Sequence, residues 1–217
     1  MERKTDVRRD TRPFYKLYDS LEQKAALEAR NGLLQFDEVL RLVDETIQNT
    51  FRLRPSTIQS LHRIAIQDIY VCAGNYRTAP VEIQGTAHQP PPWQEVPKLV
   101  EDFCDYVNDN WASSTPIHLA AYAMWKVNWI HPFAGGNGRT SRAVSYLCLC
   151  SKLGYRLPGT LTIPEQIVSN RQPYYEALDQ ADAAWAERRI NVSRMEDLLG
   201  NMLARQLVEI HKKATGE

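Results

Sequence analysis

The apolar residues of this chain recur mainly at steps of three and four positions, which is the period of an amphipathic helix. The predicted helices cover residues 14–30, 36–51, 57–70, 93–111, 116–130 and 193–212, and one more begins within 131–142. The C-terminal helix, predicted over 193–212, places seven apolar side chains on one side: Met195, Leu198, Leu199, Met202, Leu203, Leu207 and Ile210. Because such a face must pack on something, the pattern predicts an all-α protein.

One segment, residues 72–87, departs from the helical pattern. It has turn residues at both ends and alternating Val81 and Ile83 between them, which predicts a short β-hairpin that ends before the prolines at 90–92. A lone hairpin is only marginally stable in water, so we expect it to lean on the helices. Its exposed strand edge would suit pairing with a peptide of another protein. The alternative interpretation is a connector without a binding role.

Composition and charge narrow the classes of function. The 217 residues contain 26 Lys plus Arg and 26 Asp plus Glu, so the neutral chain offers no bulk charge for nucleic acid. No window reaches the roughly 18 apolar residues of a membrane span, and residues 1–10 show no secretory signal. The cysteines have no Cys-x-x-Cys spacing: Cys72, Cys104, Cys148 and Cys150. We therefore expect reduced thiols in a cytoplasmic protein and no zinc site.

The chemistry is concentrated between His131 and Arg142. His131 comes at the end of the apolar stripe of the helix predicted over 116–130, and Pro132 ends that helix. The imidazole is thereby placed at the mouth of a loop, where it can accept a proton near neutral pH. The alternative is a core histidine with satisfied hydrogen bonds.

The second half of this stretch predicts an anion site. Residues 136–138, Gly-Asn-Gly, can adopt backbone angles closed to bulkier residues and are predicted to begin a helix that carries Arg139 and Arg142. The first N–H groups of a helix lack internal partners and attract anions, and arginines three positions apart project to the same side. Phe133 is predicted to turn inward as the anchor of the loop.

Residues 131–142 resemble the signature of the Fic-domain family, His-Pro-Phe-x-Asp/Glu-Gly-Asn-Gly-Arg-x-x-Arg. Eight of its nine specified positions match, and the exception is Gly135 in the Asp/Glu position. Residues 73–83 are similar to the hairpin flap of the family, and 174–178 resemble a segment found downstream of the loop. The resemblance implies a Fic-type helical bundle with one β-hairpin flap. The expected organisation is an N-terminal helical extension (1–54), a Fic core domain (55–190) and a C-terminal helix (191–217).

The resemblance also implies an activity, protein adenylyltransferase, which moves AMP from ATP to a Ser, Thr or Tyr hydroxyl of a target protein. His131 would be the general base. The nucleotide site would consist of Phe133, Gly136, Asn137, Gly138, Arg139 and Arg142, with the arginines on the β- and γ-phosphates. The flap would hold an unknown target protein through Val81, Glu82, Ile83, Gln84 and Gly85. Aromatic residues lie near the base in this family, so Tyr174 or Tyr175 is a candidate there, although tyrosines on a helix are more typical of a core.

The glycine at position 135 leaves three outcomes open. In the family, the carboxylate at this position binds Mg²⁺ between the α- and β-phosphates, and a bound cation stabilises such a transition state by several kcal/mol. Mg²⁺ could instead arrive on the ATP itself, since it keeps several waters anyway. The site could use a different phosphate-containing donor, or bind nucleotide with little turnover. The alternative function is accordingly a non-catalytic nucleotide- or protein-binding module.

A second departure concerns control. Many Fic proteins carry an inhibitory helix with the pattern Ser/Thr-x-x-x-Glu-Gly/Asn, whose glutamate occupies the second arginine of the loop. The best counterpart here is 26–31, with Ala26 in the hydroxyl position and Arg30 in the glutamate position. Because a like charge cannot hold Arg142, we expect this lock, and the de-AMPylating role linked to it, to be absent. The alternative is that residues 14–51 only pack against the rest of the protein and have no regulatory role.

Overall fold

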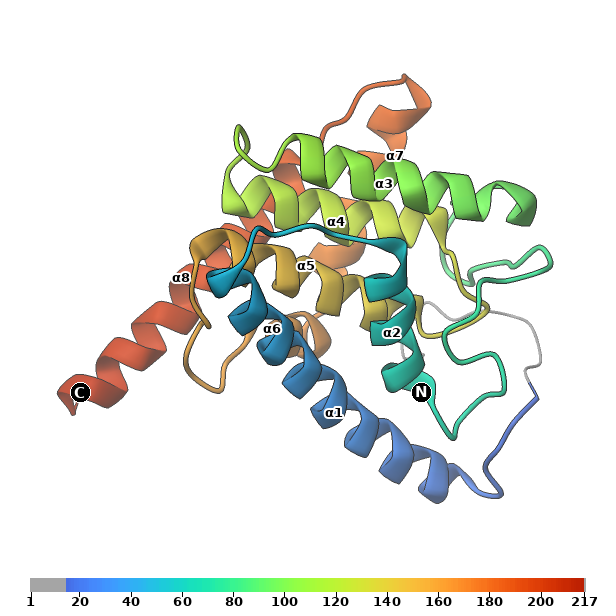
Figure 1. The fold of residues 1–217 in the computed structure, drawn as a ribbon, viewed down its shortest axis with the longest axis horizontal. Helices are drawn as coiled ribbons and strands as arrows, with labels where there is room; N and C mark the ends of the chain where they lie inside the picture. Colours follow the sequence, from blue (N-terminus) through green and yellow to red (C-terminus); the bar gives the residue numbers. More distant parts are fainter. Residues whose placement is uncertain (1–14, 217) are drawn as a thin grey trace, which may run out of the picture.

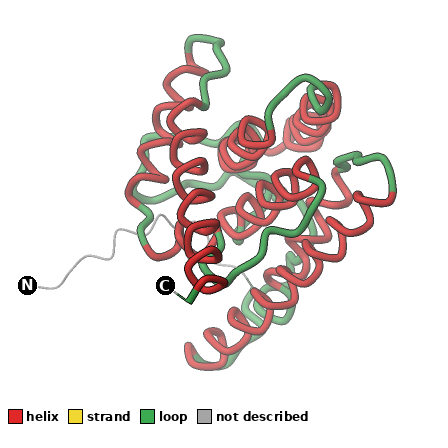
Figure 2. The backbone as a smooth tube through the Cα atoms, turned by 90° about the vertical axis from the view of Figure 1, so that its left-hand side faces the viewer, coloured by secondary structure: helices red, strands yellow, loops and turns green. Residues whose placement is uncertain are grey.

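The computed structural model describes residues 15–216, apart from the side chain of Gln48, so the stretch 1–10 in which we find no secretory signal lies outside it. The helices are α1 (Leu21–Gln48), α2 (Pro55–Ile66), the short 3₁₀ helix η1 (Trp93–Glu95), α3 (Val96–Asp109), α4 (Pro116–Ile130), α5 (Asn137–Leu153), α6 (Ile163–Ser169), α7 (Gln172–Ala186) and α8 (Ser193–Thr215). The described residues contain no strand (Figure 2). None of these helices is both long enough and apolar enough to span a membrane.

Helices α4 and α5 lie side by side at the centre of the molecule, with α3 on one side and α1 and α2 on the other (Figure 1). Helix α8 packs on α4, α6 and α7, and its C-terminal end extends away from the bundle. Every helix from α1 to α8 contributes side chains to one hydrophobic core. The predicted extension and C-terminal helix therefore share a core with residues 55–190.

Helix α4 has the range predicted for it, 116–130, because its capping residues and its buried side chains both favour a helix over these residues. The Thr115 side chain accepts a hydrogen bond from the backbone N–H of His118, and Pro116 stands at the first position of the helix. Its side chains are buried on nearly all sides, as expected for a helix between α3, α5 and α8. His131, directly after it, is thereby fixed against the centre of the fold.

The separate helices predicted over 14–30 and 36–51 are one helix, α1. The Asn-Gly pair at 31 and 32 favours a break, but Asn31 is buried and its Nδ2 donates to the Gln67 carbonyl, 2.7 Å away. The missing side chain of Gly32 leaves only open space, so it disturbs no packing. Tertiary contacts with α2 thus outweigh the local tendency to turn.

The predicted β-hairpin is wrong: residues 72–87 form an irregular loop. Its backbone closes one turn, from the Asn75 N–H to the Cys72 carbonyl (3.0 Å), and bonds to the rest of the protein through the Arg77 N–H, which donates to the Pro132 carbonyl (2.9 Å). The His88 ring, just beyond the loop, donates from Nε2 to the Trp129 carbonyl (2.9 Å). These attachments to α4 and the loop after it hold the segment without strand pairing.

The apolar face predicted for the last helix is covered only in part. Met195, Leu199 and Met202 of α8 are buried, whereas Leu207 is 42% exposed. Between them, the buried Gln206 donates from Nε2 to the Pro158 carbonyl (2.7 Å). The first half of α8 therefore packs into the core, and the second half leaves it.

Candidate active site

A cavity of about 870 Å³ opens between α1, α4, α5, α7 and the segment 67–92. Its lining includes His131, Gly135, Gly136, Asn137, Gly138, Arg139 and Arg142. The fold therefore brings the histidine, the glycine turn and both arginines of the motif to one cavity. Phe133 is not among the lining residues, so it can support the loop only from behind.

His131 caps the C-terminus of α4 in a left-handed conformation (φ 51°, ψ 57°), which is uncommon for a residue with a side chain. Its backbone N–H bonds to the Val127 carbonyl (3.0 Å), and its Nδ1 donates to the Asn128 carbonyl (3.3 Å). The proton of the neutral ring is thereby assigned to Nδ1. Nε2 is then the basic nitrogen, and the side chain is 6% exposed where it borders the cavity.

The N-terminus of α5 points its unpaired amides into the same cavity. Gly136 caps it with φ 77°, and the Gly136 carbonyl accepts from the N–H groups of Arg139 and Thr140 (3.1 and 3.0 Å). Within the described part of the chain, the backbone N–H groups of Asn137 and Gly138 have no acceptor. An anion can therefore bind there with the favourable end of the helix dipole.

Phe133 and His62 form the floor that holds this loop in place. The Phe133 ring is completely buried and stacks on the His62 ring, with centroids 3.6 Å apart and planes 6° from parallel. His62 Nε2 donates to the Gly135 carbonyl (2.8 Å), and His62 Nδ1 accepts from the Gly74 N–H (3.0 Å). Burial lowers the pKa of His62 to about 4, and the positive charge of Arg139 adds to this effect. His62 is thus a neutral link between the loop and the segment 67–92.

The Asn137 side chain closes the turn. Its Oδ1 accepts from the Phe133 N–H (3.0 Å), and its Nδ2 donates to the Phe133 carbonyl (2.8 Å). Both ends of the amide are engaged, so a ligand can meet Asn137 mainly through its backbone N–H. The side chain therefore shapes the site.

The two motif arginines have different surroundings. Arg139 donates from Nη1 to the Ala65 carbonyl (2.9 Å), and its Nη2 lies 3.4 Å from Glu28 Oε1. Arg142 is half-buried, and its Nη1 lies 3.4 Å from where a Cβ on Gly138 would be. The absence of a side chain at Gly138 thus leaves room for the Arg142 guanidinium beside the start of α5.

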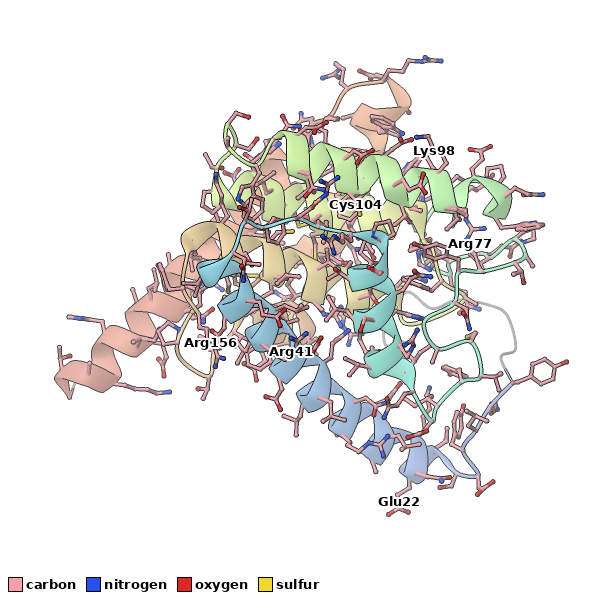
Figure 3. All side chains as sticks on the ribbon, viewed as in Figure 1. Glu22, Arg41, Arg77, Lys98, Cys104 and Arg156 are labelled. Atoms are coloured by element: carbon pink, nitrogen blue, oxygen red, sulfur yellow. The ribbon has the colours of Figure 1, made fainter. Side chains whose placement is uncertain are left out.

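Arg77 fastens the segment 67–92 to the histidine loop. The residue is 4% exposed, and its Nε donates to the His131 carbonyl (2.8 Å) while Nη2 donates to Ile130 (3.4 Å) and to Pro91. Figure 3 labels Arg77 on this segment. Its guanidinium therefore satisfies carbonyls at the C-terminus of α4, a role that the sequence does not reveal because the three acceptors come from distant positions.

Only part of the predicted flap faces the cavity. Ile83 lines it, together with Thr86 and His88 further along, whereas Val81 is buried at 7% exposure. Glu82, Gln84 and Gly85 are exposed and do not line the cavity. The segment thus borders the cavity beside His131.

Tyr174, Tyr175 and Leu178 of α7 line the wall away from α1. Tyr174 is 3% exposed, and its hydroxyl accepts from Asn128 Nδ2 (2.8 Å). This wall combines apolar rings with a few polar groups, which suits a planar heterocycle.

A divalent metal does not fit the residues beside the loop. Gly135 has no side chain, and its carbonyl already accepts from His62. The two carboxylates of the cavity are engaged elsewhere: Glu28 with Arg139 and Lys24, and Asp182 with Trp125 and His88. No cluster of three or more His, Cys, Asp or Glu suited to a metal occurs in residues 15–216, and the four cysteines are free.

A second, smaller depression of about 400 Å³ lies between α1 and Arg156, which follows α5, and Figure 3 labels Arg41 and Arg156 beside it. Both of its arginines pair with carboxylates: Arg156 with Asp44, and Arg41 with Glu45 and with Glu38 outside the depression. It therefore has neither a histidine nor an unpaired amide to offer a ligand.

The inhibitory position of α1 is turned away from the site. Arg30 pairs with Asp68 (2.6 Å) and donates to Asn31, so it does not approach Arg142. Two residues earlier, however, Glu28 reaches Arg139. A carboxylate of α1 thus contacts the first arginine of the motif, a contact that the spacing of the inhibitory pattern does not predict.

The fold and the cavity define a helical protein in which a helix N-terminus with unpaired amides lies beside a histidine. Residues 52–149 match the family model described as the Fic/DOC family, and they form a domain of that family. The match to the family ends within α5, so it includes all of the loop from His131 to Arg142.

Relatives in sequence bear the name protein adenylyltransferase Fic. The protein from Drosophila willistoni is 30% identical over 72% of this chain and 30% of its own length. The protein from Nematostella vectensis is 32% identical over 73% of this chain and 36% of its own length. This chain therefore spans about a third of the length of these relatives.

Solved structures show the same fold. A Fic domain containing signaling protein from Bacteroides thetaiotaomicron has a TM-score of 0.74 at 23% identity, covering 92% of this chain and 76% of that one. Fic-1 from C. elegans has a TM-score of 0.65 at 23% identity, covering 94% and 63% of the two chains. The all-helical architecture predicted from the sequence is thereby confirmed.

Proposed function

We propose that this protein is a protein adenylyltransferase, which transfers AMP from ATP to a Ser, Thr or Tyr hydroxyl of a target protein. The observation that carries the proposal is the shared cavity of His131 and the unpaired amides at the start of α5. Relatives named protein adenylyltransferase Fic, about 30% identical over most of this chain, support the same assignment.

In the reaction, the target hydroxyl oxygen attacks the α-phosphorus of ATP and forms the new phosphorus–oxygen bond. The bond from the α-phosphorus to the bridging oxygen breaks, and pyrophosphate leaves. The hydroxyl proton passes to Nε2 of His131, because Nδ1 carries the proton donated to Asn128. A positioned base of this kind contributes about 10²–10⁴-fold.

The nucleotide site uses the start of α5 for the phosphates. The N–H groups of Asn137 and Gly138, together with Arg139 and Arg142, bind the phosphate oxygens, while Phe133 and Gly136 keep the turn in shape. Tyr174 and Tyr175 border the base. The target chain lies along the loop with Val81, Glu82, Ile83, Gln84 and Gly85, beside His131.

A non-catalytic nucleotide- or protein-binding module is the second candidate, since Gly135 lacks the carboxylate of the family signature and Glu28 occupies Arg139. A transferase with a different phosphate-containing donor is a variant of the first candidate. We assign the protein to the cytoplasm on its four free cysteines. We also retain the division into 1–54, 55–190 and 191–217.

Incubation of the full chain with ATP and Mg²⁺ or Mn²⁺, followed by intact-mass measurement, tests the function. An added AMP on the wild type and not on His131→Ala supports it. ATP binding by both forms, without AMP on either the protein or added candidate targets, favours the binding module instead.

A further inference from the structure

The cavity contains more positive charge than the motif supplies. Its basic residues are Lys24, Arg139, Arg142 and Arg171, and its acidic residues are Glu28 and Asp182. Glu28 lies 3.8 Å from Lys24 and 3.4 Å from Arg139, so its charge is shared between them. Asp182 accepts from Trp125 Nε1 (2.8 Å) and lies 3.5 Å from His88 Nδ1. Neither carboxylate balances the remaining arginines, Arg142 and Arg171.

Arg142 and Arg171 are close enough to affect each other. Burial lowers the pKa of Arg142, and the positive charges of Arg171 and Arg139 lower it further. Among residues 15–216, no carboxylate forms an ion pair with Arg142 or Arg171, and the groups that favour the charged form of Arg142 are the neutral hydroxyls of Tyr174 and Tyr175. Two guanidinium groups that share a cavity without a counter-ion repel each other, and a bound anion relieves this repulsion.

The two arginines approach the cavity from different elements. Arg142 comes from α5 and lies against Gly138, next to the unpaired amides. Arg171 comes from α7, where it is the N-terminal capping residue and its carbonyl accepts from the Tyr175 N–H (3.0 Å). An anion at the start of α5 therefore meets positive charge from both helices.

We propose that Arg171 is a third phosphate-binding arginine, whose charge takes the place of a protein-held metal ion, so that this cavity binds a nucleoside triphosphate without a divalent cation. The proposal rests on the proposed function for the identity of the ligand. It follows from the mismatch at Gly135: the carboxylate that would hold a metal is missing, and a further guanidinium lines the same cavity. Guanidinium groups bind phosphate oxygens with two parallel hydrogen bonds, which a planar fork allows.

The test is the affinity of the full chain for ATP, measured by calorimetry in EDTA and in excess Mg²⁺. We expect wild-type affinities that agree within about threefold in the two buffers. Arg171→Ala should weaken ATP binding in EDTA about 10–100-fold, since a hydrogen-bonded charge is lost. Arg171→Lys should recover part of the loss. The matched control is Arg205→Ala, an exposed arginine of α8 that does not line the cavity.

AMP serves as the second probe, because it lacks the β- and γ-phosphates. Arg171→Ala should change AMP affinity much less than ATP affinity, and thermal unfolding of each variant shows that it is folded. Wild-type binding only with Mg²⁺, no ATP binding at all, or equal ATP affinity of Arg171→Ala and wild type would each overturn the proposal. Metal-free binding that depends on Arg171, without any AMP transfer, supports this proposal while refuting the proposed function.

Discussion

The carboxylate of Glu28 on α1 lies 3.4 Å from the guanidinium of Arg139 at the start of α5. Glu28 is 40% and Arg139 25% exposed, so the pair stands at the edge of the cavity, partly in contact with water. An anion that binds Arg139 must compete with this carboxylate. The contact therefore lowers the affinity of Arg139 for phosphate by a modest amount.

Glu28→Ala should tighten ATP binding by about 3–10-fold, because loss of the carboxylate removes a competitor worth about 1 kcal/mol. Titration calorimetry measures this, and the gain should shrink at high salt. The matched control is Glu22→Ala, an exposed glutamate in the first turn of the same helix. Equal gains from both variants would mean that net charge, and not the contact with Arg139, is responsible.

Gly135→Asp should make ATP binding respond to Mg²⁺. Gly135 is not among the residues with positive φ, so a side chain brings no backbone penalty there. We expect ATP affinity in Mg²⁺ to rise above that in EDTA, and AMP transfer to accelerate about tenfold or more, because a metal ion stabilises the transition state. Gly135→Asn, which has the same size without the charge, is the control. Identical behaviour of the two variants would contradict the prediction.

Gly136→Ala should destabilise the loop. Gly136 has φ +77°, and a Cβ there would lie 2.8 Å from Ile66 Cγ2, so both backbone and packing are strained. We expect a loss of about 2 kcal/mol and a Tm lower by about 4–8 °C. Gly154→Ala separates the two causes, since Gly154 has φ +80° with nothing near its missing side chain. Equal losses at both sites would show that packing on Ile66 costs nothing.

The stability of the fold should fall below neutral pH because of His62. Its pKa is about 4 in the folded chain and 6.5 when unperturbed, so between these values the unfolded state binds more protons. The free energy of unfolding should therefore decrease as pH falls below about 6.5, by about 3 kcal/mol at most once pH 4 is passed. Urea unfolding across this range measures it. His62→Gln should flatten the slope, whereas His211→Gln, at an exposed position of α8, should leave it unchanged.

Arg77→Ala should loosen the segment 67–92. It removes the donors to the His131 and Ile130 carbonyls and leaves them unsatisfied, which costs about 3 kcal/mol. Limited proteolysis should then cut within this segment before it cuts the helices. Arg52→Ala, at an exposed position, is the comparison. A proteolysis pattern identical to wild type would show that other contacts hold the segment.

Much of the fold is predictable because it follows local periodicity. The range of α4 and the entry of α5 were set by Pro116, Pro132 and the glycines at 136 and 138, whose backbone preferences act within a few residues. Two predictions, the break between the helices over 14–30 and 36–51 and the hairpin over 72–87, were wrong because non-local contacts decide the structure there. In both places side chains bond to partners far away in the sequence, Gln67 for Asn31 and His131 for Arg77, and these contacts outweigh local turn and strand tendencies.

The chemical groups of the site are all readable in residues 131–142: one imidazole, a glycine turn at a helix start and two arginines within twelve positions. Their spacing is local, so a single loop and helix position them. The folded arrangement of the helices adds two charges from elsewhere, Glu28 from α1 and Arg171 from α7, and the neutral ring of His62 that supports the loop. Packing of helices distant in sequence brings these groups together, and no short-range pattern records it.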